Sequence, residues 1–390
     1  MVSSVKKSRN TAYADLIHKS KNGAFDKPLK KSCKGDYFLL LAVVLLAVVG
    51  CVFIYSASNY SALATYGDAF YFVKKQAIGI ALGIAAMLFF SFYNYNKLKK
   101  FTIPVCIISV ILLVLVFVPH VGVENYGAKR WIGIGGITLQ PSEIAKFALI
   151  LFSATYVSAF PDKPKTFVGI LPILLFGLLL CGLIILEPNM SITVCVGLLM
   201  ITMLFAAGMR VKHLFILAVP AVIAAVVLIL AEPYRLKRLV AFIDPWSSPK
   251  GEGYQLLQSL YALGSGGWFG VGLFNSRQKF AFLPFAESDF ILSVIGEEIG
   301  FVGLIAFFAL LGFIIYCGIV AASRASNVFG FMLAVGITMI FGLQVIINAL
   351  VVTGSIPPTG LPLPLVSSGN TSIIIFMSEM GVLFNVSRNS

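Results

Sequence analysis

Residues 264–300, GSGGWFGVGLFNSRQKFAFLPFAESDFILSVIGEEIG, begin as a polar, glycine-rich segment and become strongly apolar. The apolar part extends over 288–320, which exceeds the roughly 20 residues that an α-helix needs to cross a bilayer. Asp289 stands at the start of this part, and Glu297 and Glu298 lie deeper inside it. The stretch therefore predicts a membrane helix with one carboxylate at its mouth and two within the hydrocarbon.

The remainder of the chain has the composition of a membrane protein. Of its 390 residues, 59% are hydrophobic and 12% are charged, and the mean hydropathy is +0.95. Soluble domains have about 25% charged residues. We therefore expect an all-α polytopic membrane protein with ten transmembrane helices. The expected helices are 37–57, 71–92, 101–119, 143–160, 167–186, 189–208, 213–231, 288–320, 328–352 and 370–387.

The distribution of lysine and arginine predicts how the protein is oriented. Residues 1–36 form a basic tail with nine of the 29 lysines and arginines, and the tail's side of the predicted helices holds 18 of them in total against ten on the other side. Six of those ten lie in the long connection after residue 231, and long connections count weakly. Because positive charge concentrates on the cytoplasmic side, we expect both termini of the membrane domain 37–387 there. The outer face then holds the connections 120–142, 232–287 and 353–369. Anionic lipid, and not nucleic acid, is the expected partner of the tail.

Cysteine and histidine do not indicate a metal cage. Five of the six cysteines lie inside apolar runs, and the three histidines are His18, His120 and His213. No spacing is typical of a zinc site or a disulfide framework. We therefore expect no metal site built by the protein alone.

Asp289 is the first candidate for chemistry. If it lies on the helix, Ser293 and two glycines share its face, which suits a groove or a close helix contact. The alternative is a solvated carboxylate that stabilises the helix start. Glu297 and Glu298 are expected about 12 Å deeper. There they are either functional groups or, as we favour, buried structural carboxylates paired with lysine, arginine or backbone.

Two further segments contain candidate site residues. In residues 127–146, Lys129 and Arg130 are adjacent cations, and Glu143 and Lys146 are three residues apart and so can pair on one helix face. Two interpretations stay open, a pyrophosphate site formed by Arg130 and Lys146, or lipid-headgroup contacts together with a structural ion pair.

The segment 353–372, TGSIPPTGLPLPLVSSGNTS, cannot be a regular helix because of its prolines. At membrane depth it must be buried in protein or line a cavity. Glu187, Pro188 and Asn189 interrupt the apolar run between two predicted helices. They form either a simple turn or part of a site.

Six motifs together resemble the SEDS family of bacterial shape, elongation, division and sporulation proteins (FtsW, RodA and SpoVE), with FtsW and SpoVE the nearest in character. The motifs are GAKRWI (127–132), LQPSEIAK (139–146), FIDP (242–245), GLFNSRQKFAFLP (272–284), SDFILSVIGEEIGFVG (288–303) and TGLPLPLVSSGNTS (359–372). The resemblance extends over residues 37–387, which is essentially the whole predicted membrane domain.

This resemblance implies a peptidoglycan glycosyltransferase in the bacterial cytoplasmic membrane. Such proteins polymerise lipid II at the outer face, and the growing strand is attached to undecaprenyl pyrophosphate. The implied partners are a class B penicillin-binding protein and other division or sporulation membrane proteins. A divalent cation, Mg²⁺ or Mn²⁺, is expected only together with the substrate pyrophosphate.

The family motifs assign roles to single residues. Asp289 matches the essential aspartate and is the expected general base, and Glu287 is expected to raise its pKa by charge repulsion. Arg130, Trp131 and Lys146 match family positions that we expect to contact substrate. The other residues expected at the substrate site are Lys129, Glu143, Glu287, Ser293, Ser367 and Ser368.

The chain also departs from the family pattern. PFAESDF replaces the usual PEAHTDF, so that Phe285 and Glu287 are unusual, and Asn189 and Asn370 stand in two other altered motifs. A specialised, sporulation-type member is therefore one possibility. Two other functions remain open, a lipid II translocase with Glu297, Glu298 and Lys146 along its path, and a non-catalytic scaffold that recruits a penicillin-binding protein.

Overall fold

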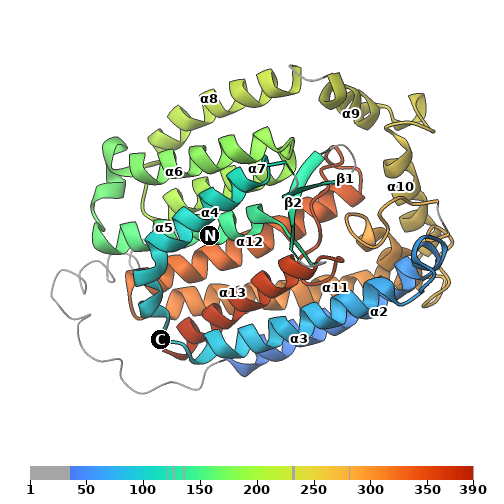
Figure 1. Cartoon of the computed structure of the whole chain (residues 1–390), viewed down its shortest axis with the longest axis horizontal. Helices are drawn as coiled ribbons and strands as arrows, with labels where there is room; N and C mark the ends of the chain where they lie inside the picture. Colours follow the sequence, from blue (N-terminus) through green and yellow to red (C-terminus); the bar gives the residue numbers. More distant parts are fainter. Residues whose placement is uncertain are drawn as a thin grey trace.

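The protein is a bundle of long helices, most of them aligned along one axis (Figure 1). The computed structural model describes residues 36–119, 121–125, 128–134, 137–230, 233–280 and 282–389. The predicted basic tail lies outside the described residues except for Asp36. Each of the ten predicted segments overlaps one long helix. These are α2 (Tyr37–Tyr66), α3 (Tyr71–Phe92), α4 (Thr102–Leu115), α5 (Pro141–Ala159), α6 (Phe167–Leu186), α7 (Met190–Ala206), α8 (Val211–Leu230), α11 (Ile291–Arg324), α12 (Val328–Val352) and α13 (Asn370–Arg388). Several of these helices, such as α2 and α11, extend beyond the predicted bounds.

Seven helical segments within the described residues are long and apolar enough to cross a membrane. They are α2, α3, α4 together with the 3₁₀ helix η1 (Tyr95–Phe101), α5, α6, α11 and α12. Helix α7 is apolar but has only 17 residues. Large apolar side chains point outward from these helices, for example Val168 with 77% and Ile103 with 71% of its surface exposed. Such a surface suits lipid and not water, so the chain is a polytopic membrane protein.

One part of the predicted fold class is wrong, because the chain is not all-α. The connection 120–142 contains a three-stranded antiparallel sheet of β1 (Gly122–Asn125), β2 (Ala128–Ile134) and β3 (Ile137–Leu139) in the order β1-β2-β3. Val123 pairs with Trp131, and Gly133 pairs with Thr138. Strands this short give a weak sequence signal, which is why the segment resembled a plain loop.

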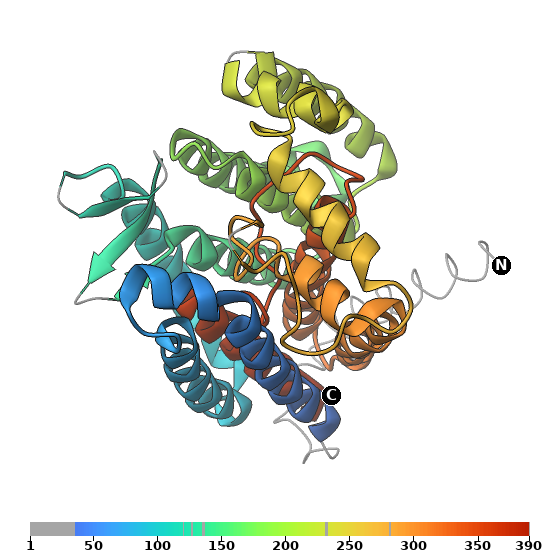
Figure 2. The same cartoon turned by 90° about the vertical axis from the view of Figure 1, so that its right-hand side faces the viewer.

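The connection 232–287 is also more regular than expected. It contains α9 (Pro233–Ile243), the 3₁₀ helix η3 (Pro245–Ser247) and α10 (Tyr254–Gly266), so that residues 264–266 end a helix. A further 3₁₀ helix, η2 (Lys163–Lys165), connects α5 to α6. Figure 2, which views the bundle from one end, shows the segment between α12 and α13 beside α10, with the sheet at the side of the bundle. The predicted outer connections therefore lie at one end, opposite the end of α13.

Helix α11 is broken at Gly300, where φ is 66° and ψ is −171°. The break leaves backbone groups that the segment 267–272 satisfies. N–H groups of this segment donate to the carbonyls of Glu297 and Glu298 at 3.0 and 3.1 Å, and the carbonyl of Gly267 accepts from Phe301 at 2.9 Å. A Cβ atom at position 300 would lie 2.2 Å from a backbone nitrogen of the same segment. Glycine is therefore required by the positive φ and by the close approach.

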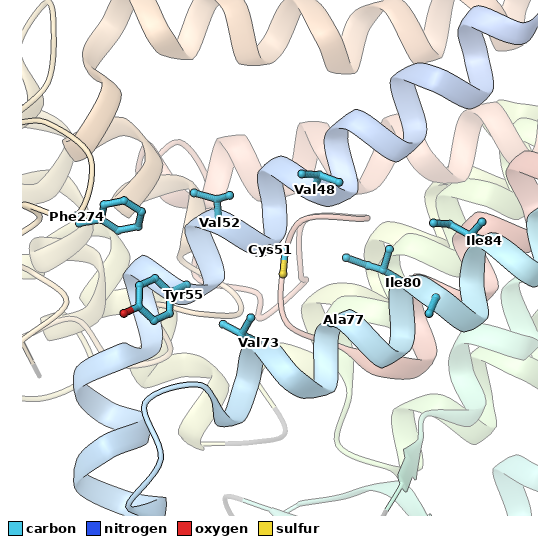
Figure 3. Close-up of a pocket in the computed structure, with 10 residues that line it drawn as sticks. Val48, Cys51, Val52, Tyr55, Val73, Ala77, Ile80, Ile84 and Phe274 are labelled. Atoms are coloured by element: carbon cyan, nitrogen blue, oxygen red, sulfur yellow. The ribbon is translucent and has the colours of Figure 1, made fainter.

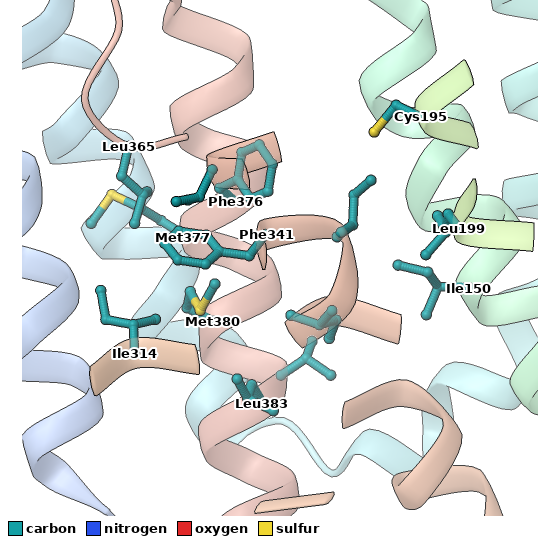
Figure 4. Close-up of a cluster of buried hydrophobic side chains, with 14 of the residues drawn as sticks. Ile150, Cys195, Leu199, Ile314, Phe341, Leu365, Phe376, Met377, Met380 and Leu383 are labelled. Atoms are coloured by element: carbon teal, nitrogen blue, oxygen red, sulfur yellow. The ribbon is translucent and has the colours of Figure 1, made fainter. Parts of the chain in front are cut away.

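The core lies where α5, α7, α11, α12 and α13 meet, and Figure 4 shows side chains from all five helices in one apolar cluster. Helix α13 packs along α3, and α12 packs against both α5 and α11. The segment between α12 and α13 is irregular, and its second half is buried, with Leu361, Leu363 and Val366 at most 2% exposed. Protein therefore encloses the non-helical backbone of residues 361–367, whereas residues 353–360 are partly or fully exposed.

Candidate active site

Asp289 lies in a turn immediately before α11, which begins at Ile291. Its backbone carbonyl accepts a hydrogen bond from Nδ2 of Asn348 on α12 at 2.9 Å. Its carboxylate faces Gly360, where a Cβ atom would lie 3.2 Å from Oδ2. Asp289 is therefore held from two directions at the end of the bundle where the predicted outer connections meet.

The structure corrects the prediction that Asp289 and Ser293 share a helix face. The N–H group of Ser288 donates to the carbonyl of Phe285 at 3.0 Å, so the chain turns here and the helix starts later. Ser293 is fully buried, and its hydroxyl group lies 2.8 Å from that of Ser259 on α10. Ser293 therefore packs between α10 and α11 and does not face a substrate.

Ser367 and Ser368 brace the turn that precedes Asp289. The hydroxyl group of Ser367 donates to the carbonyl of Ser288 at 2.6 Å and accepts from the N–H of Leu363 at 2.8 Å. The N–H of Ser368 donates to the carbonyl of Glu287 at 2.9 Å. Because Ser367 is only 6% exposed, its position fits support of the site better than the predicted contact with substrate.

The electrostatic environment of Asp289 suits an acid–base group. Burial raises the pKa of Asp289 to about 6, the guanidinium groups of Arg130 and Arg238 oppose this rise, and Glu287 adds to it. Burial also raises the pKa of Glu287. We predicted Glu287 as the cause of the rise, whereas desolvation is the larger cause. A general base is most effective when its pKa lies near the working pH.

Strand β2 separates two cations that the sequence places side by side. Successive side chains of a strand point to opposite faces, so Arg130 shares the inner face with Ile132, which is 3% exposed. Lys129 is exposed on the other face, so the two cations do not act together. Trp131, partly buried, pairs with Val123 across the sheet.

Arg130 contacts the turn between α6 and α7. Its Nη2 donates to the carbonyl of Pro188 at 2.6 Å, and its Nε lies 3.4 Å from the carbonyl oxygen of Glu187. Since its charge also acts on Asp289, Arg130 connects this turn to the candidate base. From the sequence, this turn could be either a simple turn or part of a site. Only the fold shows that Arg130 contacts it.

Glu187 is the main site residue that sequence reasoning did not select. It is 1% exposed, and neither carboxyl oxygen has a hydrogen-bond partner within the described part of the chain. Burial raises the pKa of Glu187 to about 8, and the charge of Arg130 opposes the rise. Asn189 caps α7, with Oδ1 accepting from the N–H of Ile192 at 3.3 Å. The sequence signal for Glu187 was an acidic residue between two apolar runs. A simple turn accounted for that residue equally well, so the sequence did not select it as a site residue.

Glu143 and Lys146 form a buried ion pair at the start of α5. The Nζ of Lys146 lies 2.7 Å from Oε1 of Glu143, and each side chain is 2% exposed. Ser372 at the start of α13 lies 3.4 Å from the other carboxylate oxygen. Glu379, also on α13, is 3% exposed and within electrostatic range of both. Of the two interpretations left open for Lys146, this geometry favours the structural pair.

Glu297 and Glu298 bind the segment 274–280 to the bundle. The Nζ of Lys279 lies 3.8 Å from Oε1 of Glu298, and the N–H of Ser276 donates to the same oxygen at 3.3 Å. Glu297 accepts from the N–H of Arg277 at 3.0 Å. Both acids are 1% exposed, and these partners give them a structural role.

An apolar groove of about 480 Å³ lies between α2 and α3 (Figure 3). Val48, Val52 and Tyr55 face it from α2, Val73 and Ile80 line the α3 side, and Phe274 stands at one end. Its lining is almost entirely apolar, which suits a hydrocarbon chain.

The described residues provide no group of three or more His, Cys, Asp or Glu side chains that could hold a metal ion. Asp289 and Glu287 nevertheless provide two carboxyl groups two residues apart. Mg²⁺ is commonly bound by one or two carboxylates together with substrate phosphates. The residues therefore fit a cation that arrives with a phosphorylated substrate.

The fold defines a polytopic membrane protein, and the candidate site lies at one end of its bundle. A sequence profile of cell cycle proteins, FtsW/RodA/SpoVE, matches residues 37–390. The chain therefore belongs to the FtsW/RodA/SpoVE family.

Individual relatives agree with this assignment. The chain is 39% identical to a probable peptidoglycan glycosyltransferase FtsW from Trichlorobacter lovleyi, over 90% of this chain and 93% of the relative. It is 38% identical to stage V sporulation protein E of Bacillus subtilis, over 92% and 99% of the two chains.

Two solved structures share the fold. One, from work on the structural coordination of polymerization and crosslinking by a peptidoglycan synthase complex, has a TM-score of 0.75 at 27% identity and covers 91% of this chain and 98% of that one. RodA of Thermus thermophilus has a TM-score of 0.67 at 24% identity, covers 91% and 97%, and shows the common fold.

Proposed function

We propose that this protein is a peptidoglycan glycosyltransferase that polymerises lipid II into glycan strands during cell division or sporulation. Asp289 supports the proposal most directly, because it is a partly buried carboxyl group with a pKa of about 6 beside two arginines. Relatives of 36–39% identity that span most of the chain have names with this activity.

In the proposed reaction, Asp289 takes the proton from the 4-hydroxyl group of the acceptor sugar. The freed oxygen bonds to the anomeric carbon of the growing strand, and the bond from that carbon to undecaprenyl pyrophosphate breaks with inversion. Negative charge then develops on the leaving pyrophosphate. Arg130 and Arg238, which act on Asp289 electrostatically, provide positive charge there.

The proposed topology places this chemistry outside the cell. Ten spans, with both termini in the cytoplasm, bring Asp289, the sheet and α10 to the outer face of the bacterial cytoplasmic membrane. The groove between α2 and α3 offers an apolar surface to the prenyl chain of the substrate. A class B penicillin-binding protein is the proposed partner, and the likeness to a peptidoglycan synthase complex supports this.

A divalent cation is proposed as part of the substrate complex. Asp289 and Glu287 are the residues that would hold it, and when bound it would neutralise charge on the leaving pyrophosphate. We expect purified protein to convert fluorescent lipid II into polymer with Mg²⁺ or Mn²⁺ present, and to lose most of this activity with a chelator. Gel separation of the products measures this. Equal amounts of polymer with and without chelator would contradict the proposed cation requirement. Absence of polymer both with and without the partner would contradict the proposed glycosyltransferase activity.

Gly360→Ala is expected to lower the polymerisation rate by about 10- to 100-fold. Its φ is +71°, and the new methyl group would press on the carboxylate of Asp289, whose position decides the reaction geometry. Gly354→Ala is the matched control, because its φ is +68° but its Cβ meets only side-chain carbons of Leu256 and Leu260. Both variants should lose similar thermal stability. Equal activity of the two variants would disprove the contact with Asp289.

The two other functions fit the geometry less well. A translocase was predicted to have Glu297, Glu298 and Lys146 along a path, yet all three are buried and have structural partners. A non-catalytic scaffold would keep its function without the carboxylate of Asp289. Activity measurements on Asp289→Asn therefore distinguish a scaffold from an enzyme.

A further inference from the structure

The turn between α6 and α7 presents a buried carboxyl group that the proposed reaction does not use. Glu187 is 1% exposed, and both of its carboxyl oxygens have no hydrogen-bond partner among the described residues. Buried polar groups almost always have partners, so an unpartnered buried carboxyl group requires an explanation, of which a functional role is one. Arg130 binds the backbone carbonyls of this turn, which fixes the place of Glu187.

Two more buried polar atoms without hydrogen-bond partners in the described chain belong to the segments that hold Asp289. These are Oγ1 of Thr359 and Oδ1 of Asn348. The amide nitrogen of Asn348 is already used, because it donates to the carbonyls of Asp289 and Leu361 at 2.9 and 2.8 Å. Polar atoms without hydrogen-bond partners therefore occur on three separate segments, the α6–α7 turn, α12 and the segment before α13.

Backbone contacts connect these segments. The hydroxyl group of Ser191, in the first turn of α7, donates to the carbonyl of Thr359. The next residue, Gly360, lies against the carboxylate of Asp289. The α6–α7 turn, the segment before α13 and Asp289 thus meet in one place, and Arg130 links the first and last of them electrostatically.

We propose that Glu187 and Thr359 form a subsite that binds hydroxyl and amide groups of the acceptor sugar next to Asp289. This inference rests on the proposed glycosyltransferase function. A neutral carboxyl group and a hydroxyl group each donate and accept one or more hydrogen bonds, and the hydroxyl groups of a sugar do the same. An ionised Glu187 would only accept, and it would place a second negative charge near the base.

Because the proposed subsite requires a protonated Glu187, the rate of polymerisation should depend on pH. Burial raises its pKa to about 8, and Arg130 on β2 is the charged group that acts on it. Asp289 is acted on by Arg130, Arg238 and Glu287, and its pKa is about 6. Polymerisation should therefore fall as Glu187 ionises near pH 8.

Two substitutions at Glu187 separate hydrogen bonding from charge. Glu187→Gln keeps one donor and one acceptor without ionising, so its rate at pH near 7 should stay within about threefold of wild type, and the fall near pH 8 should disappear. Glu187→Ala should raise the KM for lipid II about 3- to 10-fold with little change in kcat. The measurement is the initial rate of polymerisation against lipid II concentration and pH, using the full chain in detergent.

Asp68→Asn is the matched control, since it is another carboxyl-to-amide change, at the connection between α2 and α3 and paired with Lys74 at 2.7 Å. It should leave the fall near pH 8 in place. Loss of activity in Glu187→Gln as severe as in Asp289→Asn would overturn the proposal, as would a wild-type profile in both Glu187 variants. If Glu187→Ala does not fold, the pH profile of Glu187→Gln decides. If the wild-type protein makes no polymer, that result contradicts the proposed glycosyltransferase function. The subsite proposal, which rests on that function, is then contradicted as well.

Discussion

Asp289→Asn is expected to lower the rate of lipid II polymerisation by about 10²- to 10⁴-fold, the range that a positioned general base contributes. Asparagine has the same shape but cannot take a proton. The substitution keeps the backbone contact with Asn348, because that bond uses the carbonyl of residue 289. The loss should therefore appear in kcat with little change in folding.

The pH dependence of stability distinguishes this variant from a misfolded one. Burial raises the pKa of Asp289 to about 6, so the folded protein binds this proton more tightly than the unfolded chain does. Stability from this group is thus present at low pH and lost as pH rises through about 4 to 6. Asp289→Asn should lack this loss and unfold at a slightly higher temperature than wild type at pH 7.

Melting temperatures and polymer gels from the same preparations make the comparison. Asp68→Asn serves again as the control, because its carboxylate is exposed and outside the site. Equal polymer from wild type and Asp289→Asn would remove this residue from the chemistry and favour the scaffold.

Long apolar runs made most of the fold predictable. The bounds predicted for α3, α6 and α12 agree with the structure to the residue, because hydrocarbon thickness fixes how many apolar residues a span requires. The sheet in 120–142 escaped detection, since its strands have three to seven residues. Nor could apolar content reveal that α11 breaks at Gly300, which depends on the segment 267–272 beside it.

The candidate site was predictable only in part. Asp289 stood out because a carboxylate at the mouth of an apolar run is conspicuous in a single sequence. The sequence showed Lys129 and Arg130 only as adjacent cations, and the strand directs them to opposite faces. Glu187 and Thr359 are far from Asp289 in the sequence, so their approach depends on how three connections fold together. Contacts between residues so far apart in the chain produce no local sequence pattern from which they could be predicted.

Lys146→Met is expected to destabilise the protein by about 3–5 kcal/mol, the usual cost of removing one partner from a buried ion pair. Its Nζ lies 2.7 Å from Glu143, and both side chains are 2% exposed. Without the lysine, Glu143 would remain buried near a second acid, Glu379. Thermal unfolding in detergent measures the loss.

Two comparisons separate a structural pair from a substrate contact. Lys165→Met breaks a pair of the same i,i+3 spacing with Asp162, at 2.9 Å, whose side chains are 46% and 49% exposed, so it should cost only about 0–1 kcal/mol. Glu143→Gln combined with Lys146→Met removes both buried charges and should recover most of the stability, because an apolar or neutral replacement of the whole pair is often tolerated. Polymerisation should recover with it. A double variant that is stable but makes no polymer would instead show that Lys146 contacts the substrate, and the pyrophosphate interpretation of this lysine would then hold.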